Sequence, residues 1–193
     1  MSRVIGILVV ALGGLPAFGQ LATDSPYRVS RPAEGIVCFH PGLETTPVTT
    51  CVIECDAGLM VVDTGLSPSM AERTRARIVA EFGNKEIRWV VNTHSHFDHS
   101  GGNQVFADAM IIGHDNTPAA MRAFYDSREA WIERRFGWLA RQEAGAADAP
   151  TGSPQAVALE ESLQFNRELI DDLLSGYVPT TPTITFSDRL SVH

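Results

Sequence analysis

The residues best suited to chemistry form one short stretch, His94-Ser95-His96-Phe97-Asp98-His99, which holds three of the six histidines in the chain. Side chains two positions apart in an extended segment point the same way, so His94 and His96 can offer imidazole nitrogens to one ion. Asp98 and His99 then turn toward a neighbouring position. Imidazole and carboxylate ligands suit zinc best, with iron or manganese as alternatives. We favour a metal site over a solvated polar loop because histidine is sparse elsewhere in the chain.

A predicted strand delivers this stretch to the edge of a sheet. The apolar run Ile87 to Val91 precedes it, and Ser100-Gly101-Gly102-Asn103 follows it. This order predicts a buried strand, a ligand-bearing loop (residues 93–99, the metal loop) and the start of a helix. A second apolar strand ends at Asp63. Burying a carboxylate is costly unless it accepts hydrogen bonds, so we expect the metal-loop backbone to donate to Asp63.

The His-x-His-x-Asp-His pattern, together with the strand that ends in Asp63-Thr64-Gly65, resembles the metallo-β-lactamase superfamily. The resemblance extends from about Ile36 to the last residue. It implies an α/β fold, the αββα sandwich of that family, with residues 36–193 forming only its first half and a helical insertion at about 118–175. It also implies that Asp63 supports the metal loop without binding metal.

The same resemblance implies hydrolysis by a metal-activated water. Zinc, with two ions in the complete enzyme, lowers the pKa of a bound water, and Asp98 binds one ion and orients the hydroxide. The metal ligands implied are His94, His96, Asp98 and His99. We therefore expect an exported zinc-dependent hydrolase that acts on an ester, thioester or amide bond, β-lactams included, and the sequence does not separate these substrates.

Two later motifs of the family are absent from this sequence. A catalytic zinc needs three protein ligands and an open position, yet the metal loop offers two ligands for each ion. The family completes the set from a Gly-His-Thr-x-Gly-Asp segment and a final histidine, whereas only His114 and His193 follow His99. Two alternatives therefore stand beside the hydrolase: a catalytically incompetent truncated remnant, or a di-iron redox member of the same fold. Besides a small-molecule substrate, the partners expected are a missing C-terminal half or a second copy of the chain.

His114 follows the apolar Ile111-Ile112 pair at the same predicted sheet end as the metal loop. It resembles a recurring histidine of the family that is not a metal ligand. We expect His114 to support the site from behind the ligands or to be structural. His40 is expected to be structural.

The N-terminus has the pattern of a secretory signal peptide. Arg3 precedes an uninterrupted apolar or glycine run from Val4 to Leu15, and small residues allow cleavage after Gly19. We expect residues 1–19 to be removed, residues 20–35 to form an irregular leader, and the mature protein to be periplasmic or secreted. A bilayer span needs roughly 20 apolar residues, so no stable membrane insertion is expected after cleavage. The net charge of −8 disfavours nucleic acid as a partner.

The three cysteines, Cys38, Cys51 and Cys55, do not form an obvious disulfide framework. Cys51 and Cys55 lie four positions apart in a predicted strand, which places them roughly 13 Å apart and beyond disulfide reach. Cys38 can pair with either cysteine across adjacent strands in an oxidising compartment. The favoured interpretation is that all three are small buried apolar residues.

Three helical regions are predicted. The first begins at Ser67-Pro68, with a capping box from Ser69 to Glu72, and ends at Gly83. The other two extend from Thr117-Pro118 to about 143 and from about 155 to 175. In related enzymes such insertions lie beside the mouth of the site, so this pair either shapes substrate choice or forms a peripheral hairpin.

Overall fold

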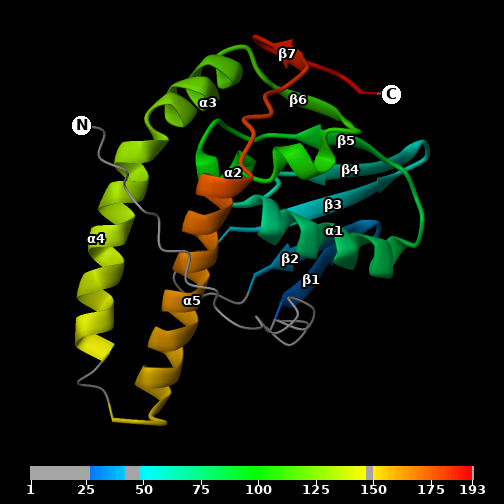
Figure 1. Ribbon diagram of the computed structural model, residues 1–193. Helices are drawn as coiled ribbons and strands as arrows, with labels where there is room; N and C mark the ends of the chain where they lie inside the picture. Colours follow the sequence, from blue (N-terminus) through cyan, green and yellow to red (C-terminus); the bar gives the residue numbers. More distant parts are fainter. Residues whose placement is uncertain (1–26, 42–47, 147–149, 193) are drawn as a thin grey trace, which may run out of the picture.

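The computed structural model describes residues 27–41, 48–146 and 150–192. Its centre is a seven-stranded sheet whose strands lie in chain order (Figure 1). Strands β1 to β4 pair antiparallel, and strands β4 to β7 pair parallel. The strands are β1 (Arg28–Ala33), β2 (Ile36–His40), β3 (Thr50–Cys55), β4 (Gly58–Val62), β5 (Ile87–Val91), β6 (Met110–His114) and β7 (Ile184–Phe186). The α/β fold class expected from the sequence is confirmed.

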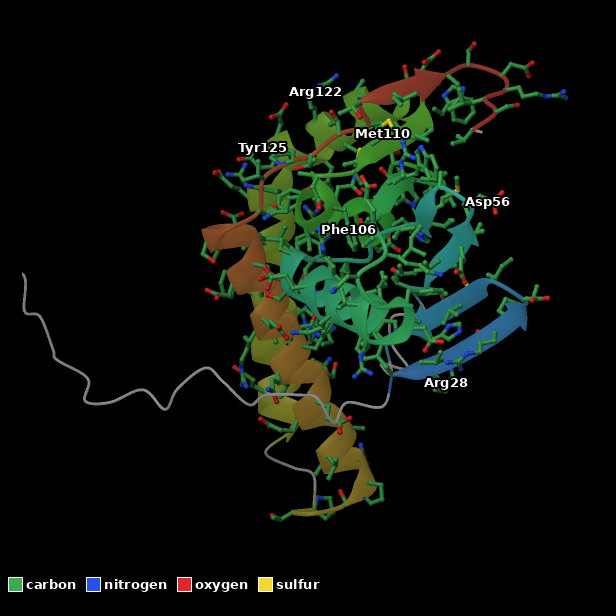
Figure 2. All side chains as sticks on the ribbon, turned by 90° about the vertical axis from the view of Figure 1, so that its right-hand side faces the viewer. Arg28, Asp56, Phe106, Met110, Arg122 and Tyr125 are labelled. Carbon is green, nitrogen blue, oxygen red and sulfur yellow. A yellow bond between two sulfur atoms is a disulfide. The ribbon has the colours of Figure 1, made fainter. Side chains whose placement is uncertain are left out.

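Helix α1 lies against the sheet, and α4 and α5 run side by side as an elongated pair beside it (Figure 1). Figure 2 shows Arg28 on β1 at one edge of the sheet and Met110 on β6 toward the other. The helices are α1 (Pro68–Phe82), α2 (Phe97–Ser100), the 3-10 helix η1 (Asn103–Phe106), α3 (Thr117–Asp126), α4 (Arg128–Ala146) and α5 (Pro154–Ser175).

The main hydrophobic core lies between the sheet and α1. Alternate residues of a strand face the same side, so every second apolar position of β2, β3 and β4 points toward the helix. Helix α1 buries one face, which includes Met70, Thr74 and Ile78. The members of this core are Val37, Phe39, Val52, Leu59, Val61, Ala71, Ile78, Ile87, Val90, Phe106 and Ile111.

Helix α1 has the predicted limits but a different cap. Ser67 is its N-cap, and the Ser67 hydroxyl accepts a hydrogen bond from the Met70 amide. The predicted capping box from Ser69 to Glu72 is therefore wrong. The amide and the hydroxyl of Ser69 instead donate to the Asp172 carboxylate of α5, over 3.2 and 2.6 Å. A negative carboxylate near the N-terminus of α1 also interacts favourably with the dipole of that helix. Asp172 therefore joins α5 to the start of α1.

The helical segment, which consists of α3, α4 and α5, contains one break that the sequence pattern does not predict. The expected single helix from Thr117 divides at Ser127 into α3 and α4, and the Ser127 hydroxyl donates to the Phe124 carbonyl. The residues of α4 and α5 form a second core with the start of α1 and with Phe97. Phe136 of α4 lies outside this core, because its side chain is 50% exposed.

Strand β1 corrects the expectation of an irregular leader. Residues 28–33 pair with β2, although every one of them is exposed. Such a strand has no apolar alternation, because backbone pairing at the sheet edge holds it in place. Pro32 is tolerated there because an edge strand leaves some amides unpaired, and the register shifts between Ser30 and Ala33.

Two of the three cysteines form a disulfide, so the interpretation of unpaired residues is wrong for them. Cys38 on β2 lies directly opposite Cys51 on β3, with their Cα atoms 4.0 Å apart. Strand register determines this pairing, and a sequence pattern does not give the register. Cys55 is free and partly buried.

The C-terminal part of the chain adds one strand to the sheet. Ile184–Phe186 forms β7 beside β6, whereas residues 187–192 are in no strand. The predicted signal peptide falls outside the described residues. No helix within residues 27–41, 48–146 or 150–192 has both the length and the apolar character needed to cross a membrane.

Candidate metal centre

The candidate site lies at the carboxyl ends of the parallel strands. Because β4, β5 and β6 run in the same direction, the residues that follow them meet at one edge of the sheet. Asp63 follows β4, and the metal loop follows β5. This edge is where open α/β sheets bind ligands.

Asp63 connects the metal loop to the end of β4. One carboxylate oxygen accepts from the Thr93 amide at 2.8 Å, and the other accepts from the Thr93 hydroxyl at 2.7 Å. The second oxygen also lies 2.8 Å from Nδ1 of His99. Asp63 is 5% exposed and has a φ of +57°, a conformation that aspartate tolerates better than most residues. The expected hydrogen bond from the loop backbone to Asp63 is present.

The contact with Asp63 sets the chemistry of His99. When Nδ1 donates to the carboxylate, Nε2 carries the free lone pair that a metal requires. Nε2 of His99 lies 3.6 Å from the carboxylate of Asp98. An imidazole nitrogen and a carboxylate oxygen are therefore neighbours on the side of the ring away from Asp63.

The three histidines of the metal loop lie together. The ring centroid of His94 is 4.6 Å from that of His96 and 4.2 Å from that of His99. The pattern of alternating residues predicts a His94 and His96 pair separate from His99, whereas the His94 ring contacts both others. Nδ1 of His94 lies 3.0 Å from the Thr93 hydroxyl.

The donor types fit a borderline divalent ion, since three imidazoles and one carboxylate come from one loop. Among the residues that the structure describes, no three His, Cys, Asp or Glu side chains converge as a metal-binding group. The loop therefore supplies suitable donor side chains at adjacent positions, but no three of them converge on one point in this structure.

A buried amide network lies behind the loop. Asn103 is 1% exposed, and its side chain exchanges hydrogen bonds of 3.0 and 2.8 Å with Asn92. It also accepts from the Thr64 hydroxyl at 2.8 Å and donates to the Thr180 carbonyl at 2.9 Å. Sequence reasoning did not assign a role to Asn103. The sequence feature that could have indicated this role is the position of Asn103 directly after the Gly101-Gly102 pair.

Two glycines allow the loop to approach the connection between β4 and α1. A Cβ atom on Gly101 would lie 2.2 Å from the Leu66 carbonyl oxygen, and one on Gly102 would lie 2.4 Å from that of Thr64. The Thr64 amide donates to the His99 carbonyl at 2.9 Å. The C-terminal end of the metal loop is thus fixed by backbone contacts.

His114 lies at the same sheet edge but bonds elsewhere. Its Nε2 is 3.2 Å from the Ser187 carbonyl oxygen, and its Nδ1 accepts from the Asn116 amide. Both partners lie outside the metal loop. The ring nitrogens of His40 lie 2.9 and 2.8 Å from the hydroxyls of Thr49 and Ser30, which is a structural arrangement.

Two surface hollows, of about 580 and 680 Å³, lie at the opposite end of the parallel strands. Glu34, Glu54 and Lys85 line both, and neither contains a metal-loop residue. Figure 2 shows Asp56, from the lining of the larger hollow, far from Tyr125 of the helical segment. These hollows are therefore separate from the candidate metal centre.

Comparison with known proteins agrees with this geometry. The model of the metallo-beta-lactamase superfamily matches residues 43–188, and the chain belongs to that family. A curated relative, the 2,4-dinitroanisole O-demethylase subunit alpha of Nocardioides sp. (strain JS1661), is 33% identical over 117 residues. The match covers 51% of this chain and 35% of the relative, so the chain spans about a third of the length of that relative.

Solved metallo-beta-lactamases are also similar. The FIM-1 enzyme from Pseudomonas aeruginosa in its mono-zinc form is 19% identical, with a TM-score of 0.43, over 51% of this chain and 46% of that one. The metallo beta lactamase from Hirschia baltica is 20% identical, with a TM-score of 0.42, over 49% and 46%. The chain thus spans less than half of either solved chain.

Proposed function

We propose that this chain carries the metal loop of an exported, zinc-dependent hydrolase that cleaves an ester, thioester or amide bond. Membership of the metallo-beta-lactamase superfamily supports a metal-dependent hydrolase. The observation that carries the proposal is the contact of 2.8 Å between Asp63 and Nδ1 of His99, because it leaves Nε2 free as a ligand.

The residues of the metal loop and Asp63 have separate proposed roles. His94, His96, Asp98 and His99 would hold zinc, with two ions when the ligand set is complete. Bound zinc supplies a water whose pKa is lowered to near neutrality. Asp98 would orient that water toward the substrate. Asp63 keeps His99 in the required tautomer and fixes Thr93 at the start of the loop.

A second candidate reaction is removal of an O-methyl group from a small aromatic ether. It rests on the relative that is an O-demethylase subunit alpha, at 33% identity. That relative is one subunit of its enzyme, which also supports a protein partner for this chain. For this chain we propose a segment or subunit that adds the remaining ligands, or a second copy of the chain.

The disulfide between Cys38 and Cys51 supports the proposed export. Disulfides persist in oxidising compartments such as the bacterial periplasm and are rare in the cytosol. We propose a periplasmic or secreted location on this ground together with the pattern of residues 1–19.

The experiment is metal analysis of the full chain after expression with zinc and iron both supplied, followed by assays on a chromogenic ester, a thioester, a β-lactam and 2,4-dinitroanisole. The proposal predicts zinc as the main metal and hydrolysis of at least one of the first three substrates. Iron as the main metal would favour a redox enzyme. Zinc binding without turnover, even after a candidate partner is added, would favour a catalytically incompetent protein.

A further inference from the structure

Helix α2 carries two of the proposed ligands and depends on tertiary contacts. It is a single turn of four residues, Phe97–Ser100. A helix this short is not stable in water on its own. Its buried residues are Phe97 and Ser100, so contacts of these two side chains decide where the turn lies.

The C-terminal half of the turn has several polar and backbone anchors. His99 is held through its ring by Asp63 and through its carbonyl by the Thr64 amide. The Ser100 hydroxyl donates to the His96 carbonyl at 2.9 Å, which closes the turn on itself. Gly101 lies directly against the connection between β4 and α1.

After Thr93, which Asp63 holds, the side chains of the metal loop have fewer anchors. The hydrogen bond of the His94 ring is to the adjacent Thr93. No side-chain hydrogen bond among the described residues involves the His96 ring, whose aromatic contact is with His94. Phe97 is the first residue after these two ligands with a buried side chain, at 8% exposed.

Phe97 reaches into the second core and touches three parts of the helical segment. Its ring stacks on that of Phe124 of α3, with centroids 4.6 Å apart and an interplanar angle of 19°. It meets the ring of Tyr177, just after α5, edge-on at 5.3 Å, and lies 6.2 Å from the Trp131 ring of α4. Aromatic pairs with ring centroids at such distances stabilise the folded state by more than the burial of their apolar area alone.

We propose that Phe97 is a positioning residue, through which α3, α4 and the segment after α5 fix the direction of the His94 and His96 side chains. This inference rests on the proposed metal-binding function. The helical segment would then help to position the metal-binding side chains through its contacts with Phe97. Because Asp63 anchors Thr93 and His99 independently, loss of Phe97 should disturb the two histidines between them, His94 and His96, first.

The test compares zinc affinity, measured by competition with a chromophoric chelator, in the full chain and in matched variants. Phe97→Ala should bind zinc at least ten-fold more weakly, and Phe97→Leu, which keeps most of the apolar volume, should recover most of that loss. Ile78→Ala removes a buried side chain from the other core, so it should lower the unfolding temperature and leave zinc affinity unchanged. Equal zinc affinities of Phe97→Ala and the wild type, or equal losses in Phe97→Ala and Ile78→Ala, would overturn the proposal. If Phe97→Ala does not fold, Phe124→Ala removes the stacking partner from outside the loop and should weaken zinc binding in the same direction.

Amide hydrogen exchange without metal provides a second readout. The amides of His99 and Ser100 donate to the His96 carbonyl, so Phe97→Ala should speed their exchange at least ten-fold. The amide of Glu54 in β3, which donates to the Gly35 carbonyl in the turn between β1 and β2, should not change its exchange rate. A wild-type chain that binds no zinc contradicts the proposed function, and local acceleration in this measurement would still uphold the positioning role. A uniform acceleration over loop and sheet would reject it.

Discussion

The carboxylate of Asp63 lies 2.8 Å from Nδ1 of His99 and also accepts hydrogen bonds from the amide and the hydroxyl of Thr93, so one buried side chain holds the start and the end of the metal loop. Asp63→Asn tests this bridge, because asparagine tolerates the positive φ but cannot serve as acceptor on both oxygens. We expect zinc affinity to fall by about 10 to 100-fold. Asp108→Asn, at an exposed ion pair with Arg75, is the matched control and should leave zinc affinity unchanged.

Substitution within the loop separates ligands from supporting residues. His96→Ala should abolish tight zinc binding and any hydrolysis together, since a site with so few ligands cannot lose one. His114→Ala should have a much smaller effect, because the bonds of His114 are to Ser187 and Asn116. Bound zinc is measured after gel filtration. Similar losses in the two variants would mean that His114 is itself a ligand.

The disulfide gives a prediction about stability. It closes a separation of 13 residues between Cys38 and Cys51, for which chain-entropy estimates give about 3 kcal/mol. A reductant should therefore lower the unfolding temperature of the wild type. Cys55→Ala should keep this sensitivity, and a Cys38→Ala, Cys51→Ala double variant should lose it. An unfolding temperature that does not respond to reductant in the wild type would contradict the pairing.

Burial raises the pKa of Tyr177 to about 12, and this shift makes the free energy of unfolding depend on pH in the alkaline range. An unfolded tyrosine ionises near pH 10, so between about pH 10 and 12 the unfolded state has released the proton while the folded state retains it. The free energy of unfolding should fall as pH rises through this window, by roughly 2 to 3 kcal/mol from this residue. Chemical denaturation from pH 9 to 12 should show a shallower decline in Tyr177→Phe than in the wild type. Parallel declines would contradict the assignment.

Much of the fold could be predicted from the sequence. The apolar run from Ile87 to Val91 predicted the limits of β5, and Pro68 and Gly83 predicted those of α1. These elements bury one regular face, and burial is what creates a periodic pattern. β1 has no buried face and is held by backbone pairing, so it left no pattern in the sequence.

The candidate site was predictable in its residue types but not in its contacts. The spacing of the proposed metal-loop ligands and the placement of Asp63 at a strand end are local features. The contact of Phe97 with Phe124 and Tyr177, and that of Ser69 with Asp172, join residues far apart in the chain. Such contacts depend on how helices dock, which no local pattern contains.

Zinc X-ray absorption on the full chain loaded with one equivalent of zinc tests the central claim most directly. The metal loop should give a shell of nitrogen and oxygen ligands at about 2.0 to 2.2 Å, with the outer scattering typical of imidazole, and His96→Ala should lose part of that scattering. A shell containing sulfur at about 2.3 Å would place the ion on a cysteine instead of the metal loop. That result, or an identical spectrum from His96→Ala, would contradict the account.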